Sequence, residues 1–420
     1  MYPYRYNYMQ NSKSRRKKRR IIIIILLIII IAAAVLGFLW EKGVFVNKKD
    51  LKSNSAILFY DDIISDDNNE NTENREIFEK PPPVKVKGLY ITGWSAGNSD
   101  RIAHFVELCD STEINALVID IKDDRGQITF LSDIAINSAA ATNIIRNPES
   151  LVNLLKEHDI YAIARIVCFK DPIWSIENPE LAIKDKTGGL WRDTNGNTWL
   201  NPYQSGSWDY IINIAKEAAK LGFDEVQFDY VRFPTDGNIK EIDYGIFGDE
   251  KSKSEAIGEF LEYAKSELIN EKIYISADVF GIIAVSTIDS QTIGQELEII
   301  AQHADSVCPM IYPSHYANKR QNGEGQNING VLFEIPDKQP YEVIYNTLVL
   351  IRERIAYLGN RAAVIRPYLQ DFTAAYLGAG YYQNYTAKQI REQIQAVYDA
   401  GFEEWILWNA SNIYSEDAFR

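Results

Sequence analysis

Short runs rich in β-branched and aromatic residues alternate along the chain with segments of helical periodicity. Apolar residues recur at helical spacing in those segments, for example at Ile211, Ile214, Ala215 and Ala218. Polar or glycine-containing loops separate the two kinds of segment, and the pattern occurs eight times. The predicted strands are Lys87 to Trp94, Ala116 to Lys122, Tyr161 to Phe169, Asp224 to Phe233, Lys272 to Phe280, Ser306 to Tyr312, Ala362 to Gln370 and Glu403 to Asn409.

Strands that alternate with helices predict a parallel sheet joined by right-handed crossovers. Eight such units between residues 84 and 420 fit an α/β fold of the (β/α)8 or TIM-barrel type, with enlarged loops at 170–207 and 315–340. A doubly wound open sheet is the alternative architecture. The chain lacks the glycine spacing of a dinucleotide fingerprint and has no Walker-type sequence, so the barrel is the favoured fold.

The first part of the chain has a different character. An uninterrupted apolar segment, residues 21–39, follows a strongly basic stretch, and as a helix its roughly 19 residues would span about 28 Å, near the thickness of a bilayer core. The positive-inside rule then predicts a basic cytoplasmic tail at 1–20, a transmembrane anchor at 21–39 in contact with the lipid bilayer, and an extracytoplasmic remainder. A cleaved signal peptide is the competing interpretation.

Residues 40–83 are rich in Asp, Asn, Glu, Lys and Ser, and they end in Pro81, Pro82 and Pro83. This composition predicts a flexible acidic linker before the barrel domain, which we place at 84–420. Together with the anchor, the linker predicts a single-pass protein of the cell membrane whose barrel lies outside the cytoplasm.

The charge distribution limits the classes of partner. The first 20 residues carry eight Lys and Arg residues and no acidic residue, and subtracting them from the formal net charge of −14 leaves −22 on the rest of the chain. Such an acidic chain argues against nucleic acid as a partner. The three cysteines, Cys109, Cys168 and Cys308, are few and far apart, so we expect them to be small core residues.

Strand periodicity predicts which side chains face the barrel interior. In the fourth strand, Val226, Phe228 and Tyr230 suit the helix-covered outside, which turns Asp229 inward at the carboxyl end of the strand. The same reasoning turns Asp278 inward on the fifth strand, beside Asp229. One aspartate at a strand end is often a helix cap or turn residue, but two inward carboxylates on neighbouring strands favour a catalytic pair.

Further polar and aromatic residues are expected to meet at the same end of the barrel. The candidates for substrate binding are Asp120, Lys122, Arg165, Arg232, Tyr312, Arg366, Gln370 and Trp408. No cofactor is expected, and the four histidines are too scattered for a zinc site. A hard cation held by Asp120, Asp123, Asp229 and Asp278 is an alternative use of the carboxylates.

An ordered set of motifs resembles a known family. The motifs are KGLYITGW, NALVIDIKDDRG, FDEVQFDYVRFP, ISADVFG, VCPMIYPSHY, IRPYLQDF and WILWNASN, and they extend over nearly all of residues 84–414. They resemble a bacterial family of glycoside-hydrolase-type TIM-barrel domains, a domain of unknown function that is distantly similar to the α-amylase and α-galactosidase barrels. The resemblance implies a carbohydrate substrate and a nucleophilic role for Asp229, whereas the acid role of Asp278 comes from strand periodicity alone.

These observations predict a glycosidase that acts on extracellular or cell-envelope polysaccharide through two carboxylates, with retention of anomeric configuration. The alternatives from other functional classes are a catalytically inactive glycan-binding barrel and an envelope scaffold. Sugar, linkage and oligomeric state do not follow from the sequence.

Overall fold

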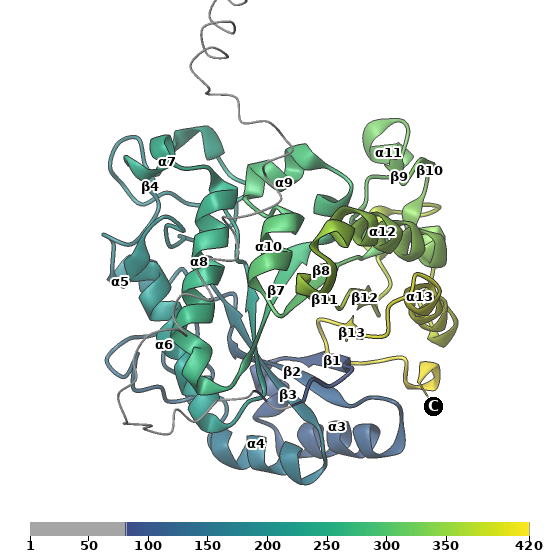
Figure 1. Ribbon diagram of the computed structural model, residues 1–420, viewed down its shortest axis with the longest axis horizontal. Helices are drawn as coiled ribbons and strands as arrows, with labels where there is room; N and C mark the ends of the chain where they lie inside the picture. The colour runs from purple at the N-terminus through teal and green to yellow at the C-terminus, as the bar shows by residue number, and fades with distance from the viewer. Residues whose placement is uncertain (1–79, 81, 420) are drawn as a thin grey trace, which may run out of the picture. The chain divides into compact units, whose positions relative to one another are not determined.

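The computed structural model describes Lys80 and residues 82–419 (Figure 1). The predicted tail, the apolar segment 21–39 and all of the predicted linker except Lys80, Pro82 and Pro83 lie outside the described residues. Within the described part of the chain, no helix combines the length and the apolar character needed to cross a bilayer.

A closed parallel barrel forms the centre of the described unit. Its sheet has nine strands, of which β11 and β12 are two pieces of one position, and pairing of β7 with β8 closes the ring. In order around the barrel, the strands are β1 (Lys87–Ile91), β2 (Ala116–Lys122), β3 (Tyr161–Val167), β5 (Glu225–Asp229), β7 (Tyr274–Phe280), β8 (Ser306–Met310), β11 (Val364–Ile365) with β12 (Tyr368–Gln370), and β13 (Trp405–Trp408). The predicted TIM barrel is therefore confirmed, and the open sheet is wrong.

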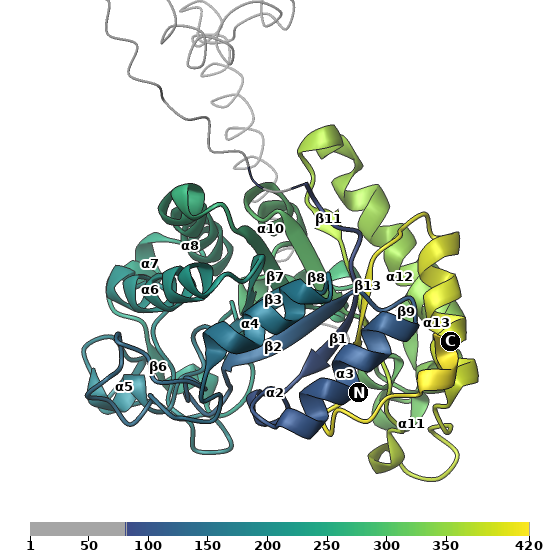
Figure 2. The same ribbon diagram turned by 90° about the horizontal axis from the view of Figure 1, so that it is seen from below.

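Helices cover the outside of the barrel, as the two views in Figures 1 and 2 show. The covering helices are α3 (Ser99–Ser111), α4 (Pro148–Glu157), α6 (Ser205–Leu221), α8 (Lys253–Leu268), α10 (Leu297–His303), α12 (Pro340–Ile355) and α13 (Ala387–Asp399). Further helices lie in the connections: α2 (Gly93–Ala96), α5 (Trp174–Glu177), α7 (Phe247–Glu250), α9 (Thr287–Ile293) and α11 (Lys319–Asn322). Short 3-10 segments complete the described helical segments: η1 (Ile239–Glu241), η2 (Ile269–Glu271), η3 (Gly281–Ala284), η4 (Pro313–His315), η5 (Pro336–Lys338), η6 (Ala356–Arg361), η7 (Ala375–Leu377) and η8 (Glu416–Ala418).

Local sequence signals fix where the covering helices begin and end. Helix α8 begins with a capping box, in which the Ser252 hydroxyl accepts from the backbone of Glu255 and the Glu255 carboxylate accepts from the backbone of Ser252. Helix α6 ends at Gly222, whose φ of 95° is a left-handed conformation that glycine adopts without steric cost. These ends set the lengths of the helices that lie against the strands.

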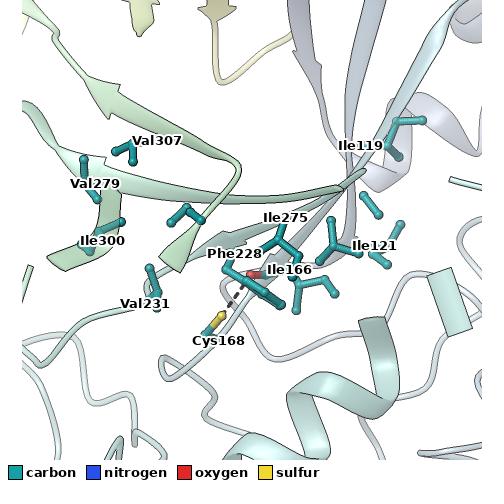
Figure 3. Close-up of a cluster of buried hydrophobic side chains, with 14 of the residues drawn as sticks. Ile119, Ile121, Ile166, Cys168, Phe228, Val231, Ile275, Val279, Ile300 and Val307 are labelled. Carbon is teal, nitrogen blue, oxygen red and sulfur yellow. Dashed lines mark hydrogen bonds between the residues drawn. The ribbon is translucent and has the colours of Figure 1, made fainter. Parts of the chain in front are cut away.

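Two hydrophobic layers hold the barrel together. The outer layer fills the space between strands and helices, and Figure 3 shows part of it, including Ile119, Ile166, Phe228 and Ile275. The inner layer fills the barrel itself and is made by Val86, Tyr90, Ala116, Val118, Ile163, Cys308, Tyr312, Tyr368 and Ile406. The predicted outward position of Phe228 is confirmed, and the three cysteines are buried and unpaired as expected.

The connections contain structure that periodicity did not predict. Strand β4 (Lys184–Asp185) in the first enlarged loop pairs with β6 (Ile242–Asp243), and β9 (Gln326–Ile328) pairs with β10 (Val331–Phe333) in the second. Each of these strands has only two or three residues. Such short strands carry too few alternating positions for a sequence signal.

Candidate active site

Asp229 and Asp278 end up side by side at the carboxyl end of the barrel. Asp229 is the last residue of β5, and Phe228 pairs with Ala277 across the two strands, so the next residues, Asp229 and Asp278, stand at the same height. Neighbouring strands are about 4.8 Å apart. Both side chains are almost fully enclosed, with 5% of Asp229 and 1% of Asp278 exposed. The pair that periodicity predicted is therefore present as a geometric arrangement.

Arg165 of β3 supplies the positive charge for this pair. Its Nε donates to the Asp229 carboxylate at 3.0 Å, and its two Nη groups donate to Asp229 and to Asp120 of β2. Its Nε also lies 3.8 Å from the Asp278 carboxylate. Burial alone would lower the pKa of Arg165, but Asp120 and Asp229 raise it well above its ordinary value. The guanidinium is thus a permanent cation among three carboxylates.

Asp278 has a different environment from its neighbour. Neither of its carboxylate oxygens has a hydrogen-bond partner among the described residues. Burial, followed by the nearby Asp229 carboxylate, raises the pKa of Asp278 well above its ordinary value. Asp229, in contrast, accepts from Arg165 and from the backbone N–H of Tyr230 at 2.5 Å. Burial therefore favours the protonated form of Asp278, whereas Asp229 has an ion pair and two hydrogen-bond donors.

Both carboxylate oxygens of Asp120 accept hydrogen bonds. The Tyr90 hydroxyl donates to one of its oxygens at 2.6 Å, and Arg165 donates to the other. Burial raises the pKa of Asp120 in spite of these partners. Tyr90 was not among the candidates, although periodicity could have found it, because Leu89 and Ile91 belong to the outer layer and leave Tyr90 facing inward.

Aromatic rings lie next to the carboxylates. Trp408, at the end of β13, has its ring centre 6.1 Å from that of Tyr90, with 24° between the planes, and 5.7 Å from that of Tyr312. Phe372 completes the cluster, at 5.4 Å from Trp408. Flat apolar rings of this kind suit the faces of sugars. The structure therefore places the predicted Tyr312 and Trp408 with the acidic residues.

The predicted inward position of Lys122 is wrong. The register between β2 and β3 shifts between Asp120 and Lys122, and this bulge turns the side chain of Lys122 out of the barrel. Its ammonium group donates to the backbone of Val167 at 2.6 Å and lies 2.9 Å from the carboxylate of Asp171. Lys122 therefore supports the loop after β3, and Arg165 is the cation that pairs with Asp229.

Arg366 faces the interior as expected, but at the other end of the barrel. It bonds to Glu225, the first residue of β5, at 2.7 Å and to Glu404, which precedes β13, also at 2.7 Å. This buried network forms a lower layer, separated from the carboxylates by the hydrogen bond between Tyr368 and Gln227. The expectation that Arg366 contacts substrate does not fit this position.

Arg232 packs among aromatic side chains near the site. The Arg232 guanidinium lies 4.6 Å from the ring centre of Phe280 and 5.1 Å from that of Trp199, and it donates to the carbonyl of Phe233. Burial lowers the pKa of Arg232.

The amide of Gln370 is fully engaged. It donates to Asp337 at 3.1 Å and to the carbonyl of Phe372 at 3.0 Å, and it accepts from the backbone of Ser314 at 3.1 Å. Gln370 therefore joins the loops that follow β8 and β12, and its contacts suit a positioning residue.

Three of the four carboxylates that could have held a hard cation surround Arg165 instead, and the fourth, Asp123, lies apart from them. Asp123 lies in the loop after β2, where one of its oxygens accepts from the backbones of Arg125 and Gln127. Asp120 and Asp229 bind Arg165 instead. Among residues 82–419, no group of three or more His, Cys, Asp or Glu side chains has the arrangement of a metal site.

A cavity of about 660 Å³ opens at the carboxyl ends of β7 and β8. It begins at Phe280, two residues beyond Asp278 on β7, and at Met310, which pairs with Phe280 across β7 and β8. Residues of the second enlarged loop, including His315 and Arg320, form its other walls. Periodicity could not have found this cavity, because its walls come from irregular segments.

One known structure shares the fold, and two others are reported for their similarity to the chain. The glycoside hydrolase domain of PgaB (BpsB) from Bordetella bronchiseptica is 12% identical over 79% of this chain and 95% of that domain, with a TM-score of 0.57. A hypothetical protein from Ruminiclostridium thermocellum ATCC 27405 is 44% identical over 46% of this chain and 97% of its own, with a TM-score of 0.42. An α-galactosidase from Thermus thermophilus is 11% identical over 81% of this chain and 61% of its own, with a TM-score of 0.48.

No curated protein matches the sequence. The profile of one family, described as "Putative glycosyl hydrolase domain", matches residues 88–414. These residues contain every strand of the barrel except the first residue of β1, together with both carboxylates of the pair. The chain therefore belongs to the family of putative glycosyl hydrolase domains.

Proposed function

We propose that the barrel hydrolyses glycosidic bonds by a two-carboxylate mechanism in which Asp229 is the nucleophile and Asp278 the general acid and base. The observation that carries the proposal is the contrast between these neighbours. Asp229 is ion-paired with Arg165, whereas Asp278 is buried without a hydrogen-bond partner among the described residues, with a raised pKa. Glycosidases need two carboxyl groups in opposite protonation states at the start of the reaction.

The first half of the reaction forms a covalent intermediate. The Asp229 carboxylate attacks the anomeric carbon while the bond to the leaving oxygen breaks, and Asp278 transfers its proton to that oxygen. The ester formed on Asp229 is neutral, so the repulsion that raised the pKa of Asp278 disappears when Asp278 becomes an anion. The two charge changes therefore compensate each other.

The second half releases the sugar. Asp278, now an anion, takes a proton from water, and the water oxygen attacks the anomeric carbon and displaces Asp229. Two inversions give net retention. The register of β5 and β7 supports this course, because side chains at equal height on strands about 4.8 Å apart suit the ~5 Å separation of retaining enzymes.

The surrounding residues would bind the sugar. Trp408 and Tyr312 offer ring faces, and Asp120, held by Tyr90 and Arg165, offers an acceptor for sugar hydroxyl groups. We further propose that the substrate is an extracellular or cell-envelope polysaccharide, and that residues 21–39 anchor the protein in the cell membrane. This location rests on the sequence of the N-terminal segment.

A panel of polysaccharides tests the proposal when it is incubated with the wild-type protein, Asp229→Asn and Asp278→Asn. Release of reducing ends by the wild type, and a loss of at least about a thousandfold in Asp229→Asn, is the expected result. Glu403→Gln is the matched control, because Glu403 is an exposed carboxylate that pairs with Lys85 just before β13, at the far end of the barrel.

The near-complete enclosure of both carboxylates favours one competing function, a glycan-binding barrel without turnover. That function predicts sugar binding by the wild type and by Asp229→Asn alike, with no reducing ends released by either protein.

A further inference from the structure

The cavity at the carboxyl end of β7 has a distinctive wall. It is lined by Phe280, Gly281, Ile282, Met310, Ser314, His315, Tyr316, Asn318, Arg320, Gln321, Tyr376 and Leu377. Its volume of about 660 Å³ lies within the range of sites that bind small molecules and sugars. The segment that carries α11 forms one side, and Figure 1 shows this segment with β9 and β10 next to α12.

The position of the cavity connects it with the proposed acid. Asp278 and Phe280 are two residues apart on β7, so both side chains lie on the same side of that strand, with Phe280 one step nearer the mouth. A sugar in the cavity would therefore lie at the end of the strand that carries Asp278, on the side of the strand that Asp278 faces. In the proposed mechanism, the group next to the acid is the leaving group.

The charge of the cavity wall is opposite to that of the protein. The chain carries a formal net charge of −14, yet the lining residues within the described part of the chain include no Asp or Glu and one permanent cation, Arg320. Desolvation lowers the pKa of His315, so Arg320 is the lining residue whose positive charge does not depend on pH. Ser314, Asn318, Gln321 and Tyr376 add uncharged polar groups.

Arg320 is held in place without a carboxylate. Its Nη1 donates to the carbonyl of Leu377 at 3.0 Å, and its guanidinium lies 5.7 Å from the ring centre of Tyr381. Gly378 makes this approach feasible, because a Cβ there would lie 2.1 Å from Nη1. Within residues 82–419, Arg320 forms no ion pair, although its helix neighbour Lys319 pairs with Glu334 at 2.6 Å.

Arg320 is exposed, and a guanidinium with unused donors can bind an anion. Nε and Nη2 of Arg320 have no acceptor among the described residues, and these two groups form a planar fork that matches a carboxylate. The net negative charge of the protein disfavours an anionic sugar, and a cation in the cavity wall offsets that effect locally. The positive charge at this cavity would therefore favour anionic over neutral substrates.

We propose that this cavity binds a sugar residue that carries a carboxylate, with Arg320 as its receptor, so that the substrate is an acidic polysaccharide. The placement of that residue on the leaving-group side rests on the proposed function. The preference for a carboxylate rests on the cavity itself and is measurable as binding, without turnover.

Penta-galacturonate is a suitable probe, because every one of its sugar residues carries a carboxylate and any binding register presents one to the cavity. Its methyl ester is the neutral counterpart. Titration calorimetry on the full-length protein is expected to show at least about tenfold tighter binding of the acid than of the ester, with a difference that shrinks as salt is added.

Arg320→Gln is expected to remove the preference, and Arg320→Lys to restore part of it, because the charge returns without the fork. Lys319→Gln is the matched control, since it removes one positive charge from the same helix outside the cavity lining and should leave the preference unchanged.

Equal affinity for acid and ester, a preference that survives Arg320→Gln, or no binding of penta-galacturonate to the wild type would overturn the proposal. A clear preference without hydrolysis of any glycan would contradict the proposed reaction and support the cavity assignment. Hydrolysis of neutral glycans alone would contradict the cavity assignment and support the reaction.

Discussion

Asp278 stands beside Asp229 at the ends of adjacent strands, yet the two carboxyl groups have opposite surroundings. Asp229 accepts from Arg165 and from the backbone of Tyr230, whereas both oxygens of Asp278 lack a hydrogen-bond partner among the described residues. A buried carboxyl without donors is stable only when protonated. This contrast has consequences for stability as well as for catalysis.

The stability of the protein should depend on pH through Asp278. A carboxyl whose pKa is raised on folding binds its proton more tightly in the native state, so stability falls as pH rises from the unfolded pKa of about 3.9 towards the raised native pKa. Asp278→Asn removes this dependence. In urea denaturation across that pH window, the free energy of unfolding of the variant should rise relative to that of the wild type by up to about 1.4 kcal/mol per pH unit. A constant difference between the two proteins would contradict the raised pKa.

Two buried arginines should respond differently to the same change. Arg165→Lys loses the fork that joins Asp120 and Asp229, and we expect kcat/KM to fall by about a hundredfold, because the nucleophile is no longer held in place. Arg366→Lys weakens the lower layer around Glu225 and Glu404, so we expect a lower Tm with kcat/KM within about threefold of the wild type. A loss of activity in Arg366→Lys at a temperature where the variant is folded would contradict the separation of the layers.

Strand periodicity predicted the barrel and the pair at its centre because these features depend on regular alternation. Phe228 faces the helices, and Asp229 and Asp278 stand at equal height on neighbouring strands. Periodicity gives the direction of a side chain but not its height along the barrel axis. The prediction that Arg366 faces inward is therefore confirmed, but the residue was assigned to the wrong end of the barrel.

Irregular backbone explains what the sequence did not predict. The bulge between Asp120 and Lys122 turns Lys122 outward. The alternation of inward and outward side chains along a strand does not indicate where such an extra residue occurs. Most of the cavity wall comes from loops. There Arg320 donates to the carbonyl of Leu377 and occupies the space that a side chain at residue 378 would fill. Such contacts join residues far apart in sequence and follow no period.

Trp408 should contribute to sugar affinity. Its ring lies among those of Tyr90, Tyr312 and Phe372, and Trp408→Ala removes the largest flat surface beside the carboxylates. We expect KM to rise about tenfold and kcat to change little. Trp405→Phe is the control, because Trp405 is fully buried in the outer layer and donates to Tyr398. An equal rise in KM for both variants would point to a general loss of structure.

The location of the protein can be measured on intact cells. If residues 21–39 form an uncleaved anchor, added protease should release a fragment whose new N-terminus lies within 41–83, since the sequence of that segment predicts an accessible linker. The closed barrel should resist cleavage under the same conditions. A protein found entirely in the medium, with its N-terminus near residue 36, would instead indicate a cleaved signal peptide.

Small nucleophiles can identify which carboxylate attacks the sugar. Asp229→Gly should abolish hydrolysis, and the space that it leaves on β5 should admit azide, which then attacks an activated glycoside directly. The expected product is a glycosyl azide of inverted configuration, while the wild type gives a first sugar of retained configuration by NMR. Asp278→Gly should lose most of its activity on substrates with poor leaving groups but little of its first step on activated aryl glycosides, whose departure needs no proton. An inverted first product from the wild type, or an inverted azide from Asp278→Gly instead of Asp229→Gly, would show that the two roles are assigned wrongly even though the pair is correct.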